Sequence, residues 1–157
     1  MTGTGSDDRP NHGGGCLCGA VRYRVRGALR EVIGCHCRQC RRTSGHYVAA
    51  TRAAHADFEL ERDEGLRWYT SSPGIRRGFC GVCGASLFWQ RDGADAISIM
   101  AGTFDGPIGV RLARHIHTAT AGDYYSIDPA LPQATGATGA GAAGSDGAIP
   151  PDPEEVP

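Results

Sequence analysis

Three cysteines lie within six residues of the chain, in the segment CHCRQC at 35–40. A thiolate is a soft ligand that suits zinc, and three thiolates on one short loop can bind the same ion. Zinc takes four ligands, so three protein donors leave one position for water or a substrate. We therefore predict a catalytic zinc held by Cys35, Cys37 and Cys40, provided that no fourth protein ligand completes the site.

The other four of the seven cysteines form two pairs, Cys16 with Cys18 and Cys80 with Cys83. Four thiols make a complete tetrahedral set, so we predict a closed, structural zinc that ties the start of the domain to its middle. Spacing alone leaves this partition open, because the side chains of a C-x-C pair on a straight strand point to opposite faces. Both thiols can bind one ion only if the backbone turns there, and the neighbouring glycines would allow such a turn.

Three other uses of the cysteines are less well supported. A disulfide framework would leave one of the seven thiols unpaired, and the first twelve residues lack the apolar core of a signal peptide. A redox motif at Cys80 and Cys83 would be expected beside a β-α-β pattern, which the flanking sequence does not show. A thiol sensor, in which residues 35–40 lose zinc on oxidation, is the third alternative.

Several histidines and arginines lie close to the cysteines in the sequence. His36 stands between two predicted ligands, and we expect its side chain to point away from the metal. His115 and His117 are expected to lie on one face of a strand, where they would pack or line a pocket. Arg76 and Arg77 precede a cysteine pair, where they would offset the negative charge of thiolate-bound zinc.

The hydrophobic pattern predicts a mainly β fold of many short strands. In residues 20–26, Val21, Tyr23 and Val25 alternate with arginines, which is typical of a half-buried strand with a solvated arginine face. Helical periodicity is scarce, and only 38–43 is expected to form a helical turn, ending at Ser44-Gly45. Further strands are expected over 47–51, 66–70 and 110–118, with a hairpin formed by 86–91 and 96–101.

The length of 157 residues indicates one domain. We expect a disordered leader over residues 1–12, a zinc-binding domain over 13–134 and a disordered Gly/Ala/Pro/acidic tail over 135–157. The predicted domain carries fifteen arginines against eleven acidic residues, which suits an anionic small molecule. The total charge of −1 gives no reason to expect a nucleic-acid partner. No apolar stretch approaches the roughly 18 residues of a membrane helix, and the clustered thiols favour a reducing, cytoplasmic location.

Five segments together resemble the family of glutathione-dependent formaldehyde-activating enzymes, which shares its domain with centromere protein V. The resemblance implies the Mss4-like β-fold, a zinc-containing fold of short antiparallel strands. It also implies two zinc ions per chain, with the C-x-C and C-x-x-C pairs holding the structural ion and the C-x-C-x-x-C segment holding the catalytic one. The segments are GGCLCGAVRY (14–23), CHCRQCRRTSG (35–45), FCGVCGASLFW (79–89), MAGTFD (100–105) and RHIHTATAGDYYSI (114–127).

The same resemblance implies a carbon–sulfur lyase that joins a thiol such as glutathione to formaldehyde, giving S-(hydroxymethyl)glutathione. Coordination to zinc deprotonates a thiol, which makes it the better nucleophile. We expect Arg38, Arg41 and Arg42 to bind the carboxylates of the thiol substrate. The alternative is a non-catalytic zinc-binding module for protein interaction, in which a protein ligand such as histidine closes the second site.

Overall fold

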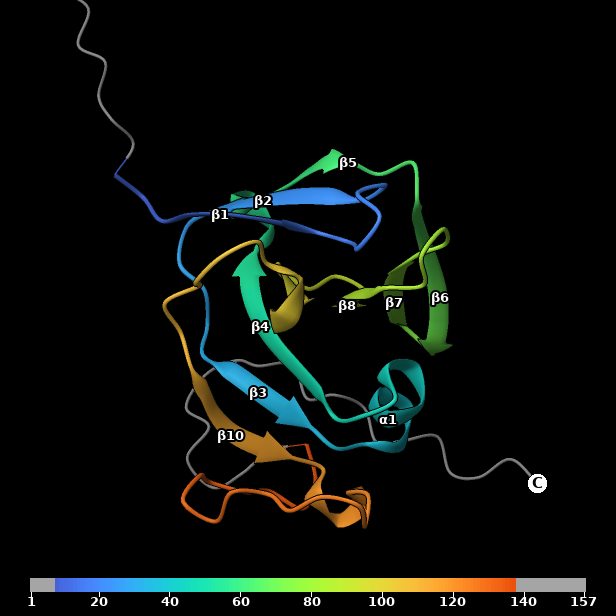
Figure 1. The fold of residues 1–157 in the computed structure, drawn as a ribbon, viewed down its shortest axis with the longest axis vertical. Helices are drawn as coiled ribbons and strands as arrows, with labels where there is room; N and C mark the ends of the chain where they lie inside the picture. The colour runs from blue at the N-terminus through green and yellow to red at the C-terminus, as the bar shows by residue number, and fades with distance from the viewer. Residues whose placement is uncertain (1–7, 138–157) are drawn as a thin grey trace, which may run out of the picture.

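A computed structural model describes residues 8–137 of the chain. The expectations for 1–7 and 138–157 lie outside these residues, and the first strand begins at Asn11, inside the range expected as leader. The described residues form ten strands, one α-helix and three short 3-10 helices (Figure 1). The strands are β1 (Asn11–Gly15), β2 (Arg22–Arg26), β3 (Val32–Cys35), β4 (Val48–Ala54), β5 (Phe58–Arg62), β6 (Leu66–Ser72), β7 (Ile75–Cys80), β8 (Ser86–Arg91), β9 (Ala96–Met100) and β10 (Leu112–Ile116). The helices are α1 (Arg38–Ser44), η1 (His55–Asp57), η2 (Ala101–Thr103) and η3 (Thr118–Thr120).

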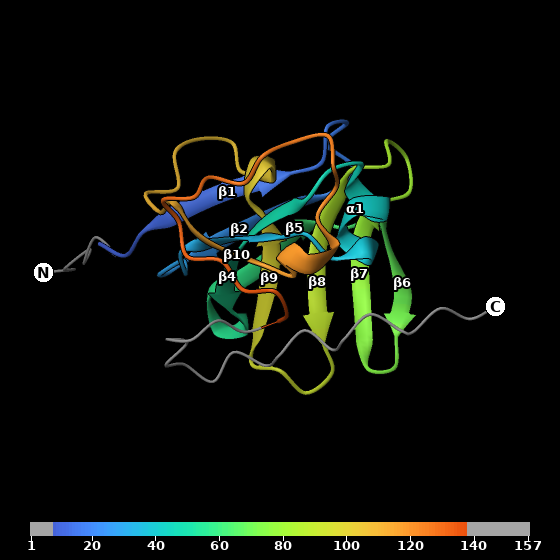
Figure 2. The same ribbon diagram turned by 90° about the horizontal axis from the view of Figure 1, so that it is seen from below.

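The strands form two sheets. A three-stranded sheet has the order β1-β2-β5, and a seven-stranded sheet has the order β10-β3-β4-β9-β8-β7-β6. In Figure 2 the strands of the small sheet run across the direction of β9 and β8. The mainly β prediction is confirmed, and every pair of named strands in the described residues is antiparallel except one. The pair formed by β10 and β3 is parallel, because the chain returns to the far edge of the large sheet by a long crossover instead of a tight turn.

The main core lies between the two sheets. Val21, Tyr23 and Val25 are fully buried, as their alternation with arginine predicts. The Tyr23 ring packs against Phe58 and Phe88, with centroid separations of 5.8 and 5.4 Å. The Tyr23 hydroxyl hydrogen-bonds to the Thr103 hydroxyl at 2.7 Å, which satisfies the one polar group that this ring carries into the core.

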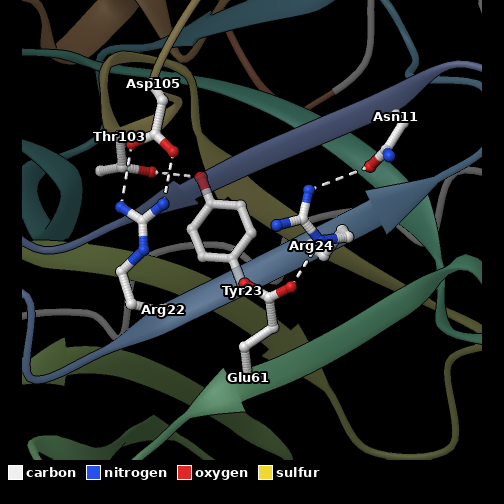
Figure 3. Close-up of polar contacts among 7 residues, drawn as sticks. All are labelled: Asn11, Arg22, Tyr23, Arg24, Glu61, Thr103 and Asp105. Atoms are coloured by element: carbon white, nitrogen blue, oxygen red, sulfur yellow. Dashed lines mark hydrogen bonds and ion pairs between the residues drawn. The ribbon is translucent and has the colours of Figure 1, made fainter.

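We expected the arginine face of β2 to be solvated, but each arginine there meets a carboxylate. Figure 3 shows two of these contacts, those of Arg22 and Arg24. Arg26 donates to Glu59 across the β2–β5 pair at 2.6 Å. The other two ion pairs join Arg22 to Asp105 and Arg24 to Glu61. Such exposed pairs contribute little to stability, and two of the three join β2 to β5.

Candidate metal centres

Two groups of cysteines come together in the structure. We call Cys16, Cys18, Cys80 and Cys83 the four-thiol cluster, and Cys35, Cys37 and Cys40 the three-thiol cluster. Within each cluster all sulfur atoms lie within 4.8 Å of one another. The sequence predicted this grouping, and both groups suit a thiophilic metal such as zinc.

The four-thiol cluster has the sulfur spacing that zinc requires. A Zn–S bond of about 2.3 Å in a tetrahedron places neighbouring sulfur atoms about 3.8 Å apart. The Cys16–Cys18 sulfur separation is 3.6 Å, and the Cys18–Cys80 separation is 3.7 Å. The four thiols therefore fit a closed zinc site.

Two tight turns give the four-thiol cluster its shape. Cys16 and Cys18 follow β1 instead of lying in it, so the geometric objection to a C-x-C pair on a straight strand does not apply. Gly19 and Gly84 have φ values of +79° and +78°, a left-handed conformation that glycine adopts without a steric penalty. The Val21 amide donates to the Cys16 sulfur at 3.2 Å, and the Val82 amide donates to the Cys80 sulfur at 3.4 Å. Hydrogen bonds of this kind orient metal ligands and favour the thiolate.

The three-thiol cluster is assembled where β3 meets α1. Cys35 is the last residue of β3, Cys37 caps the helix, and Cys40 lies in its first turn. The Cys40 amide donates to the Cys37 sulfur at 3.4 Å, so one ligand fixes the start of the helix that carries another. The helical turn predicted for 38–43 is present, and it ends at Gly45 with a φ of +80°. All three cysteines are at least 96% buried.

An arginine of β7, the strand next to the β6 edge of the large sheet, reaches the three-thiol cluster. The Arg77 guanidinium donates to the Cys40 sulfur at 3.7 Å and to the Gln39 side-chain oxygen at 3.1 Å. Hydrogen bonds from the thiols of Cys35 and Cys37, followed by the charge of Arg77, lower the pKa of Cys40 well below its usual value. The sequence predicted that Arg77 would compensate the charge of a thiolate cluster, but it did not predict that this would be the three-thiol cluster.

No fourth donor joins the three-thiol cluster among residues 8–137. No histidine, carboxylate or further thiol of that range lies within ligand distance of all three sulfur atoms. Its other neighbours are apolar side chains of β3, β4 and β10 and of the segment after β10, namely Ile33, Val48, Ile116 and Ala134. The described residues therefore offer a metal three ligands in a largely apolar setting.

The predicted substrate arginines lie along α1. Arg38 and Arg42 are exposed, and Arg41 is half-buried. Their spacing of i, i+3 and i+4 places them on one helical face. The Arg41 Nε atom is buried and has no hydrogen-bond partner among the described residues. The three arginines thus lie on the helix that also carries Cys40.

His36, His46 and His115 lie with three tyrosines in a separate group beside the three-thiol cluster, and they do not join the cluster. His36 is fully buried, and its Nε2 atom hydrogen-bonds to His115 Nδ1 at 2.7 Å. Burial, followed by the nearby His115 and His46, lowers the pKa of His36 to about 4, so its ring is neutral at pH 7. His117 does not share a strand face with His115, because it follows β10 with a left-handed backbone. Sequence reasoning missed Tyr125, whose hydroxyl hydrogen-bonds to His36 Nδ1; the signal available was its place in the similar segment 114–127.

Comparison with known proteins is consistent with this architecture. A crystal structure of a Rhodobacter sphaeroides protein matches with a TM-score of 0.51 and 26% identity, covering 64% of this chain and 99% of that one. No curated protein matches the chain. Within the described residues, no helix has the length and apolar character needed to cross a membrane. The sequence model of the glutathione-dependent formaldehyde-activating enzymes matches residues 11–120, most of the chain, and the chain belongs to that family.

Proposed function

We propose that this chain is a zinc-dependent carbon–sulfur lyase that adds a thiol such as glutathione to formaldehyde or a related small electrophile. The observation that carries the proposal is the three-thiol cluster, which has no fourth donor among residues 8–137. Three ligands leave a metal one position for a substrate, as catalytic zinc sites do. Family membership supports the chemistry, and the location that we propose is cytoplasmic because the thiols must stay reduced.

In this proposal Cys35, Cys37 and Cys40 hold the catalytic zinc, and the four-thiol cluster holds a structural one. Bound zinc keeps a substrate thiol deprotonated at neutral pH, which makes it a nucleophile. Arg77 balances the negative charge of the three thiolates through its hydrogen bond to Cys40. The apolar side chains around the cluster limit the access of water, which strengthens that electrostatic interaction.

We assign the recognition of the thiol substrate to α1. Glutathione carries two carboxylates, and Arg38, Arg41 and Arg42 can each form a two-point contact with a carboxylate. One short segment would then both hold the zinc and bind the carboxylates of the thiol, since Cys37 and Cys40 lie at the start of the same helix. The predicted domain, residues 13–134, contains every residue named in this proposal.

The test is the rate of adduct formation from glutathione and ¹³C-labelled formaldehyde, followed by NMR and corrected for the uncatalysed reaction. Cys37→Ser should reduce the protein-dependent rate to background while the fold is retained. Val82→Ser is the matched control, because Val82 is 72% exposed and lies between Cys80 and Cys83, outside the three-thiol cluster. Wild-type activity in Cys37→Ser would refute the catalytic zinc. A wild-type protein that binds two metals and shows no activity with any thiol would favour the protein-interaction module instead.

A further inference from the structure

All four polar atoms of His36 form hydrogen bonds, and all four partners come from one later segment, residues 115–125. Its amide donates to the Ile116 carbonyl at 3.0 Å, and its carbonyl accepts from the Thr120 hydroxyl at 3.1 Å. Its ring is bonded to His115 through Nε2 and to Tyr125 through Nδ1. Because His36 lies between Cys35 and Cys37, residues 115–125 determine the backbone path that joins two thiols of the three-thiol cluster.

The chain is shaped so that this segment can reach His36. β10 pairs with β3 in a register that sets His115 beside Gly34 and Ile116 beside Cys35. His117 then takes a left-handed conformation, with φ 54° and ψ 39°, which turns the chain into η3 and back toward His36. The segment beyond β10, orange in Figure 1, lies beside β10.

Residues 132–136 bind the outer edge of β10 by backbone hydrogen bonds and hold this segment in place. The His115 amide donates to the Pro132 carbonyl, and the Ala134 amide donates to the His115 carbonyl, both at 2.9 Å. The His117 amide donates to the Gly136 carbonyl at 2.8 Å. Residues 132–136 thus cover the edge of β10, and the part of the chain that contacts His36 is fixed on both sides.

The three-thiol cluster needs such outside support more than the four-thiol cluster does. Four thiols complete the coordination of a zinc ion by themselves, whereas three leave the geometry to be fixed by the surrounding chain. Residues outside the ligand set that orient ligands typically change metal affinity by roughly 10- to 100-fold when they are mutated. His36 and its partners occupy that position for Cys35 and Cys37.

We propose that His115 and Tyr125 are positioning residues for the three-thiol cluster, which hold His36 so that Cys35 and Cys37 stay in their metal-binding arrangement. The inference rests on the proposed metal occupancy of that cluster. Tyr125 lies beyond residue 120, where the family match ends. His115, by contrast, lies inside the matched range.

Tyr125→Phe tests the proposal, because it removes the hydroxyl bonded to His36 and keeps the ring. Tyr124→Phe is the matched control, since that hydroxyl bonds to His46 at 3.1 Å and not to His36. The measurement is the release of zinc from each full-length protein into an excess of a chromogenic chelator. The phase that disappears in Cys37→Ser is the one that belongs to the three-thiol cluster.

We expect that phase to be roughly 10- to 100-fold faster in Tyr125→Phe, with the four-thiol phase and Tyr124→Phe unchanged. The cobalt-substituted Tyr125→Phe protein should also show an altered thiolate-to-cobalt absorption band. Thr120→Val removes another hydrogen bond to His36 and should act in the same direction. Release at the wild-type rate in Tyr125→Phe, or equal acceleration of both phases, would overturn the positioning role. A zinc content and release that Cys37→Ser leaves unchanged would instead refute the proposed three-thiol metal centre, and the positioning role with it.

Discussion

Replacing Cys80 by serine should destabilise this protein far more than replacing Cys37 by serine. Cys80 is fully buried at the end of β7, and through the four-thiol cluster it connects to Cys18, 62 residues earlier in the chain. The three-thiol cluster connects only residues 35–40. A metal that joins distant residues restricts the unfolded chain much more than one that joins near neighbours, so its loss should have the larger effect on stability.

The difference can be estimated from the loop lengths. The chain-entropy relation for a covalent cross-link gives about 4 kcal/mol for a loop of 62 residues and about 2 kcal/mol for a loop of five. Native domains are typically stable by only about 5–15 kcal/mol. For the roughly 130 residues that the structure describes, these losses correspond to falls in the unfolding midpoint of about 15 °C and about 7 °C.

Thermal unfolding followed by circular dichroism, with zinc content measured on the same samples, is the assay. Val82→Ser is the control, because Val82 lies between two predicted ligands and its side chain is mostly exposed. Its midpoint should stay within about 2 °C of the wild type, since exposed substitutions usually have small effects. Equal losses in Cys80→Ser and Cys37→Ser would contradict the loop-closure reasoning, and so would a Cys80→Ser protein that keeps the wild-type midpoint.

Two further predictions concern packing. Gly34→Ala would place a methyl group 2.6 Å from His115 Nδ1, which is closer than atoms can pack. We expect a loss of about 1–3 kcal/mol in denaturant unfolding and faster metal release from the three-thiol cluster; an unaltered release rate would contradict this. Tyr23→Phe removes the hydroxyl bonded to Thr103 at 2.7 Å and should cost about 1 kcal/mol without changing the content of either metal. Loss of a metal from Tyr23→Phe would show that the core and the clusters are coupled.

Local sequence patterns predicted the parts of this structure that depend on neighbouring residues. Alternation identified Val21, Tyr23 and Val25 as the buried face of a strand, because side chains on a strand point to opposite faces in turn. The hairpin of β8 and β9 followed from two apolar runs around Asp92-Gly93. The grouping of the cysteines followed from their number and spacing, together with glycines that allow tight turns. Their role as metal ligands stays a prediction.

Contacts between distant parts of the chain could not be predicted in the same way. Arg77 reaches Cys40 because β7 and α1 meet in the fold, and the sequence separates these two residues by 37 positions. The Tyr125 hydroxyl meets His36 across 89 positions. Both contacts depend on the order of strands in the large sheet, including the parallel placement of β10. No local pattern fixes that order, since each strand alone could pair with several others.

The placement of the two clusters follows from the charge that each would carry with zinc. Zinc with four thiolates has a charge of −2, and zinc with three has a charge of −1. A buried charge is unfavourable unless a partner compensates it. The four-thiol cluster includes Cys18, which is exposed, so water can solvate its larger charge. The three-thiol cluster is buried, but Arg77 supplies one compensating positive charge at Cys40. The buried centre would then be close to neutral before a substrate arrives, and a neutral centre repels an incoming thiolate less than a doubly negative one would.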